Sequence, residues 1–168
     1  PLQGGTEHSA SFDVLWDYQY LYVAVQVEND TDRIAGSAWM EGDVVNLFFD
    51  KTNHKSSPYT ENDWQIGVGY NPDDAFDPYI LFGGGVVASQ EAREELSRNI
   101  LAATSDTDNG WTAEIAVPWD SLGIDPYLQK DFGFDIGVDN KNASHGSGEV
   151  DYLLWETNDR TSFWNDTA

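Results

Sequence analysis

The sequence predicts an all-β domain: an antiparallel β-sandwich of the jelly-roll or immunoglobulin-like kind, with one or two short helical turns. Two observations support this prediction. Hydrophobic residues recur mostly with a period of two, and turn signals separate about eight short apolar runs. A length of 168 residues suits one domain, so residues 1–168 are expected to form a single domain.

The first predicted hairpin contains the clearest strand. Residues 19–28 alternate strictly between aliphatic positions and polar or aromatic positions, which is typical of a strand with one face buried. Residues 12–16 are expected to pair with it across a turn at 17–19. Further strands are predicted at residues 43–50, 64–70, 99–104, 111–117, 132–138 and 150–155.

Turn and helix signals lie between these strands. Asp108-Asn109-Gly110 is typical of a hairpin turn and connects two predicted strands. Residues 89–98 begin with a serine cap and contain good helix formers, so they predict one or two helical turns. Residues 119–123 follow a proline and end in glycine, which predicts another short turn of helix.

Composition excludes several classes of function. The chain has 30 acidic and 8 basic residues, and its net charge of −22 would repel nucleic acid. No apolar run is long enough for membrane insertion, and the absence of cysteine excludes disulfides and thiol-rich zinc sites. Such an acidic chain fits an extracellular protein, a saline habitat or a protein that binds hard cations.

Two of the seven tryptophans stand apart from the rest. Trp39 and Trp164 lie among polar residues, and exposed aromatics of this kind stack on the apolar face of a sugar ring. The alternative is that both rings anchor loops under the edge of the sandwich, and the sequence leaves both open. Core packing is expected for the tryptophans in strand-like or post-strand runs: Trp16, Trp111, Trp119 and Trp155.

Oxygen-bearing side chains gather between two predicted strands. Asp50, Asn53 and Asp63 are candidate ligands for Ca²⁺, which takes six to eight oxygens. A solvated acidic surface is the alternative for any single aspartate.

Catalytic patterns are weak. The three histidines lie in unlike loops, no serine lies in a G-x-S-x-G turn, and 30 acids make chance carboxylate pairs inevitable. The chain is therefore expected to be a non-enzyme.

Several motifs in the same order resemble family 9 carbohydrate-binding modules. The match runs over about residues 12–166 and is strongest at VLWDYQYLYVAVQVEND (14–30), DVVNLFFD (43–50), NHK (53–55), DWQ (63–65), GWTAEIAVPWDSLGI (110–124), FGFDIGVDN (132–140) and WND (164–166). The resemblance implies a DOMON-like β-sandwich with structural Ca²⁺, usually attached to a secreted polysaccharide-degrading enzyme such as a xylanase. It also implies that Trp39 and Trp164 hold a sugar between them.

Two positions depart from the family pattern. A glutamate that contacts sugar in the family is replaced by Asn46, and an arginine that does so is replaced by Gly67. Asn46 and Gln65 can still donate and accept hydrogen bonds to a sugar.

The sequence therefore predicts an extracellular or cell-surface module that binds oligo- or polysaccharides and targets a parent enzyme to glycan chain ends. The alternative is a Ca²⁺-stabilised structural or adhesive domain, such as part of a surface layer or filament, in which the sugar site is altered or lost. Self-assembly and covalent attachment to other domains belong to this second interpretation.

Overall fold

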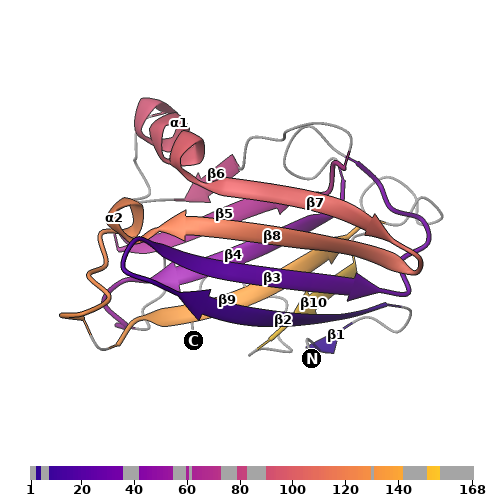
Figure 1. Cartoon of the computed structure of the whole chain (residues 1–168), viewed down its shortest axis with the longest axis horizontal. Coiled ribbons are helices and arrows are strands. Elements are labelled where there is room, and N and C mark those ends of the chain that lie inside the picture. Colours follow the sequence, from indigo (N-terminus) through magenta and orange to yellow (C-terminus); the bar gives the residue numbers. More distant parts are fainter. Residues whose placement is uncertain are drawn as a thin grey trace.

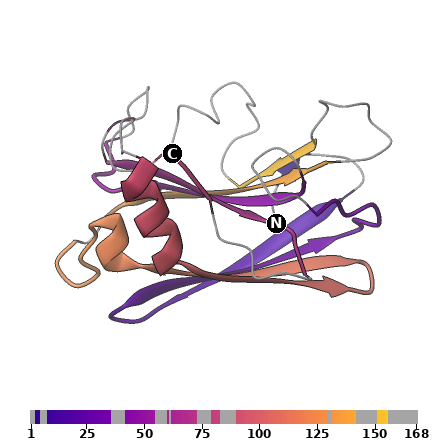
Figure 2. The same ribbon diagram turned by 90° about the horizontal axis from the view of Figure 1, so that it is seen from above.

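Two antiparallel sheets lie face to face, with a helix at one end of the sandwich (Figures 1 and 2). The computed structural model describes residues 3–4, 8–35, 42–54, 60, 62–72, 79–82, 90–129, 131–141 and 151–155. The six-stranded sheet contains, in spatial order, β1 (Gln3–Gly4), β10 (Asp151–Leu154), β9 (Gly133–Asn140), β4 (Val44–Asp50), β5 (Asp63–Gly69) and β6 (Tyr79–Phe82).

The second sheet has four strands. Its order is β2 (Ser9–Trp16), β3 (Tyr20–Glu28), β8 (Gly110–Pro118) and β7 (Leu101–Thr107), and the helices are α1 (Gln90–Asn99) and α2 (Trp119–Leu122). Helix α2 packs against strand β8 of this sheet, whereas α1 packs against β6 of the first sheet. The predicted all-β antiparallel sandwich with short helices is thus confirmed. Neither of the two helices is long and apolar enough to cross a membrane.

The core lies between the sheets and follows from alternation in their central strands. On β3, the aliphatic positions predicted to share a face are all buried: Leu21, Val23, Val25 and Val27. They belong to one hydrophobic cluster with residues of β4, namely Val45, Leu47 and Phe49. Burial of such side chains stabilises the fold by about 1.5–3 kcal/mol each.

Strand β4 differs from β3 because it is buried on both faces. All seven of its residues are buried, although only alternate ones point into the core. The other face of the six-stranded sheet therefore carries buried polar side chains, among them Asn46 and Asp50. Buried polar groups need hydrogen-bond partners, and a bound ligand can supply them. A ligand-binding site is therefore expected on this second face.

The tryptophans only partly follow the sequence prediction. Trp111 and Trp119 are buried in the core, as predicted. The prediction was wrong for Trp16 and Trp155, which are 55% and 38% exposed. Trp16 ends β2, an edge strand of its sheet, where no further strand covers the ring.

Candidate functional site

A chain of polar side chains crosses three neighbouring strands on the second face of the six-stranded sheet. Asn46 on β4 donates from Nδ2 to Oδ2 of Asp139 on β9, at 3.0 Å. Gln65 on β5 donates from Nε2 to Oδ1 of Asn46, at 3.2 Å. The structure thus brings together the two amides predicted from the sequence, and it adds Asp139, whose role no motif in the sequence had indicated.

Asn46 lies between two glycines in the sheet. Its cross-strand partners are Gly67 on β5 and Gly137 on β9. Side chains directly opposite each other in antiparallel strands have Cβ atoms about 4.5–5.5 Å apart. The two positions that depart from the family pattern, 46 and 67, are therefore direct neighbours, so an acidic and a basic side chain there would lie within reach of each other.

Gln65 is fully buried and has an unused acceptor. Its Oε1 has no hydrogen-bond partner among the described residues. An unsatisfied buried carbonyl costs about 1–3 kcal/mol, which a donating hydroxyl would recover. Trp39 and Trp164 lie outside the described residues, so their relation to this amide pair stays a prediction.

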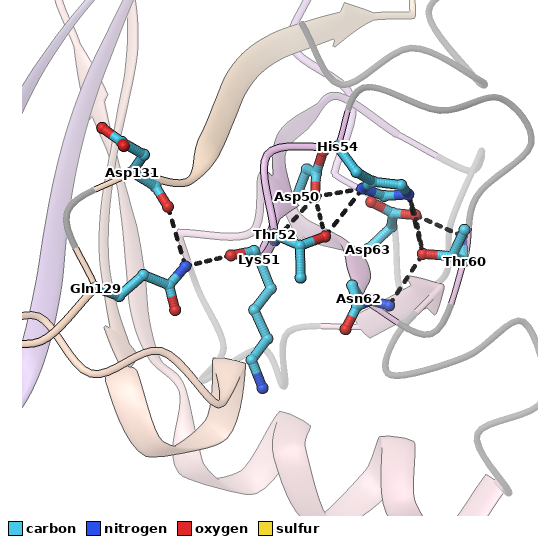
Figure 3. Close-up of polar contacts among 9 residues, drawn as sticks. All are labelled: Asp50, Lys51, Thr52, His54, Thr60, Asn62, Asp63, Gln129 and Asp131. Atoms are coloured by element: carbon cyan, nitrogen blue, oxygen red, sulfur yellow. Dashed lines mark hydrogen bonds and ion pairs between the residues drawn. The ribbon is translucent and has the colours of Figure 1, made fainter.

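A second polar cluster lies at the end of β4 and the start of β5 (Figure 3). Asp50 and Asp63 are direct cross-strand partners, and both are buried. His54 lies beside them: its Nδ1 is 2.7 Å from Oδ1 of Asp50, and its Nε2 is 3.9 Å from Oδ2 of Asp63. One ligand atom from each of the three residues lies within 4.8 Å of the others.

Hydrogen bonds in the β4–β5 connection orient these carboxylates. Thr52 donates its backbone N–H to Oδ1 of Asp50 at 3.0 Å. Thr60 donates both its backbone N–H and its hydroxyl to Oδ2 of Asp63. Asn53 is exposed and adopts a left-handed backbone conformation with φ 49°, which the turn after β4 requires. Among the described residues, no contact joins its side chain to the two carboxylates.

The donor set of this cluster suits a divalent cation. Two carboxylates placed directly opposite each other repel unless positive charge lies between them. Oδ1 of Asp63 is buried without a hydrogen-bond partner among the described residues, which leaves it available as a ligand. The carboxylates fit Ca²⁺, whereas the imidazole of His54 is a ligand that Zn²⁺ and other transition metals prefer. His54 was not predicted as a metal ligand, because a single histidine in a loop has no neighbouring ligand at a characteristic spacing.

Asp43, just before β4, is fully buried and joins three segments. Its Oδ2 accepts the backbone N–H of Ile34 at 2.7 Å, and its Oδ1 accepts that of Lys141 at 2.7 Å. Burial raises the pKa of Asp43 to about 7, although the two N–H donors favour the charged form. This carboxyl holds the chain ahead of β4, and the residue after β9, against the sheet that carries the amide pair.

The family is settled by a match over nearly the whole chain. A family model described as "Carbohydrate family 9 binding domain-like" matches residues 2–168. The chain belongs to carbohydrate-binding family 9. Family 9 domains are binding modules, so this one is non-catalytic.

Relatives of this family 9 module are parts of large enzymes. The chain is 29% identical over 167 residues to endo-1,4-beta-xylanase A of Thermoanaerobacterium saccharolyticum, covering 99% of this chain and 13% of that protein. It is 28% identical over 165 residues to exoglucanase XynX of Acetivibrio thermocellus, covering 98% of this chain and again 13% of the relative. The module thus corresponds to about an eighth of the length of each.

Solved structures share its fold. A family 9 carbohydrate-binding module from Caldicellulosiruptor kristjanssonii in complex with cellotriose superposes with a TM-score of 0.72 at 19% identity, covering 99% of this chain and 78% of that one. The complex with glucose gives 0.71 at 19% identity, with 99% and 80% covered. The family 9 sandwich is therefore retained at low sequence identity.

Proposed function

We propose that this family 9 module binds gluco- or xylo-oligosaccharide chains and holds a secreted polysaccharide-degrading enzyme near glycan chain ends. The family match over residues 2–168 carries the proposal. Two observations add to it: the similar structures hold cellotriose and glucose, and the relatives are named as xylanases and an exoglucanase. Because such polymers are too large to enter a cell, the module would act outside it.

In this proposal a sugar ring is stacked between Trp39 and Trp164, and its hydroxyls bind Asn46 and Gln65. The indole faces suit the apolar C–H face of a pyranose. Oε1 of Gln65 has no partner within the part of the chain that the structure describes, which supports a role in accepting a hydrogen bond from a sugar hydroxyl. Asn46 and Gln65 are both fully buried, so contact with them requires the sugar to displace the atoms that bury them.

The test is calorimetry with cellotriose and xylotriose on the wild-type chain and on Trp39→Ala. Losing one stacking face should weaken binding about tenfold or more, while the melting temperature should stay close to that of the wild type. Trp155→Ala, which also removes a partly exposed indole, is the matched control and should keep the wild-type affinity. Unchanged affinity in Trp39→Ala for every sugar that binds would remove Trp39 from the site.

We also propose that Asp50 and Asp63 bind a structural divalent cation, with Ca²⁺ as the expected ion. A cation that binds only the folded chain raises its stability by mass action. Adding Ca²⁺ after treatment with a chelator should therefore raise the melting temperature, and Asp63→Asn should abolish the rise. If the melting temperature rises with Zn²⁺ but not with Ca²⁺, His54 is a ligand together with the two aspartates. If it rises with neither ion, the proposal is contradicted.

A second candidate function is a Ca²⁺-stabilised structural or adhesive domain whose sugar site is lost. The resemblance implies that a glutamate and an arginine of the family are replaced by Asn46 and Gly67, and this favours the second function, as does the hydrogen bond that Gln65 donates to Asn46. The same Ca²⁺ titration, followed by size-exclusion chromatography, separates the two functions. Assembly on adding Ca²⁺ together with no sugar binding would establish the structural function, whereas a monomer that binds sugar would exclude it.

A further inference from the structure

Three exposed aromatic side chains gather at one end of the sandwich. Trp16, Tyr18 and Tyr127 are 55%, 67% and 68% exposed. They lie where the β2–β3 turn meets the segment that follows α2, at the end of the molecule that Figure 1 shows on the left. The rings of Trp16 and Tyr127 pack edge to face, with centroids 6.2 Å apart and planes at 69°. Scattered exposed hydrophobic residues are ordinary, but a group of them in contact marks a binding surface.

Two of these side chains, Tyr18 and Tyr127, border a surface hollow of about 430 Å³, and Trp16 lies against Tyr127 beside it. Tyr18 and Tyr127 line it from the two segments, together with Pro126 and the buried Trp119. Two acidic residues, Asp120 and Asp125, also line it, as do Gly123 and Ile124. This size falls within the range of roughly 300–1,000 Å³ that is usual for small-ligand sites. We refer to it as the Tyr18–Tyr127 hollow.

Hydrogen bonds fix the wall that carries Tyr18. Asp17 accepts the backbone N–H groups of Gln19 and Tyr20 at its Oδ1, both at 2.8 Å, which closes the turn around Tyr18. Trp119 then ties this turn to α2: its Nε1 donates to the backbone oxygen of Asp17 at 2.9 Å, and its backbone N–H donates to that of Gln19 at 3.0 Å. The two walls of the hollow are therefore bonded to each other.

The wall that carries Tyr127 is fixed in the same way. Gly123 ends α2 in a left-handed conformation with φ 65°, which turns the chain back over the helix. Asp125 accepts the backbone N–H groups of Tyr127 at 2.9 Å and Leu128 at 3.1 Å at its Oδ1. A site held in this way loses little conformational entropy when a ligand binds.

The lining identifies the chemical class of ligand. Tyrosine faces suit the apolar face of a pyranose ring, while carboxylates at the rim accept hydrogen bonds from its hydroxyls. The net charge of −22 and the two lining aspartates would repel an anionic sugar. A neutral hexose or pentose unit therefore fits the hollow best.

We propose that the Tyr18–Tyr127 hollow is a second sugar-binding site, which takes one ring of a neutral oligosaccharide. Among the described residues, none that lines it belongs to β4 or β5, the strands that carry Asn46 and Gln65, so it is separate from this amide pair. The choice of ligand class rests on the proposed function. A module with two sites would hold a polymer at two places and dissociate from it more slowly than either site alone.

The test is calorimetry and NMR titration of the full chain with cellotriose and xylotriose. The wild type should bind at two sites, and the indole N–H signal of Trp16, assigned with Trp16→Phe, should shift on titration. Tyr18→Ala and Tyr127→Ala should each weaken the second event about tenfold or more and leave the first unchanged. Leu128→Ala is the matched control, because Leu128 is the more exposed neighbour of Tyr127 and does not line the hollow.

The variants distinguish failure of this site from failure of the site proposed above. If Trp39→Ala removes all binding and the Trp16 signal does not move, the second site is overturned and the proposed function stands. If Trp39→Ala still binds sugar and Tyr127→Ala does not, the hollow is the sugar site and the role of Trp39 fails. If the wild type binds neither sugar by either method, both are overturned. The exposed positions of Tyr18 and Tyr127 should leave the melting temperatures of their variants close to the wild-type value.

Discussion

Asp43 is fully buried, and its burial makes the stability of the fold depend on pH. Its pKa in the folded chain is raised to about 7 from an ordinary 3.8, mainly by burial. A carboxyl whose folded pKa lies above its unfolded value favours the folded state when it is protonated. Its contribution is therefore complete below about pH 4 and is lost as the pH rises through about 7. Each pH unit in this window changes the free energy of unfolding by at most about 1.4 kcal/mol.

Replacing Asp43 by asparagine should remove this part of the pH dependence. The amide stays neutral, so the loss of stability between about pH 4 and about pH 7 should become smaller than in the wild type. The variant should also be less stable at low pH by about 1–3 kcal/mol, because the amide NH₂ faces a backbone N–H donor. Thermal unfolding across this pH range measures both effects. Asp131→Asn, an equal change of charge at an exposed position, should keep the wild-type slope, and an Asp43→Asn slope like that of the wild type would contradict the assignment.

At the scale of elements, the turn of the β7–β8 hairpin requires glycine at its last position, Gly110. Gly110 pairs with Thr107 across the hairpin and with Glu28 on β3. A Cβ atom at this position would overlap the backbone oxygen of Val27 and lie 2.8 Å from its carbonyl carbon. Since these are backbone atoms in the middle of a sheet, only a shift of the strands could relieve the overlap.

Gly110→Ala should therefore destabilise the chain by about 3 kcal/mol or more, in the range of overpacking in a core. For a domain of this size, that is a fall in melting temperature of about 10 °C. Asp108→Ala, in the exposed part of the same turn, should change the melting temperature by only a few degrees. Equal effects of the two substitutions would show that the strands near Gly110 adjust more easily than the structure indicates.

Sequence patterns predicted the elements where local alternation coincides with burial. Strand β3 is the clearest case, because its aliphatic face is also its buried face. Strand β1 was not predicted because its two residues are too short for a periodic signal, and β6 was not predicted because its sequence, YILF, is apolar throughout and does not alternate. The exposure of Trp16 depends on its place at a sheet edge, which is a property of the fold and cannot be found in its neighbours along the chain. For the same reason, Asp50 and Asp63 could be predicted to lie together only on the assumption that their two strands form a hairpin. The position of His54 beside them could not be predicted.

At the scale of the whole molecule, the net charge of −22 acts on every state of the chain. Folding brings the acidic groups closer together, so their mutual repulsion is stronger in the folded state than in the unfolded state. Only 8 basic residues stand against the 30 acidic ones. Among the described residues, Arg33 pairs with Asp106 at 2.9 Å, and the neutral hydroxyl of Tyr70 donates to the same carboxylate at 2.6 Å. The repulsion therefore lowers the stability of the fold.

Salt should raise the stability of this module through screening. The screening length falls from about 30 Å at 0.01 M to about 8 Å at 0.15 M, which covers the spacing between charges on a small domain. With Ca²⁺ held at a fixed, saturating concentration, the melting temperature should rise over this range and level off at higher concentrations of NaCl. An uncharged solute at equal osmolality is the control and should give no such rise at low concentration. A melting temperature that does not change with NaCl would show that the acidic groups repel one another no more in the folded chain than in the unfolded chain.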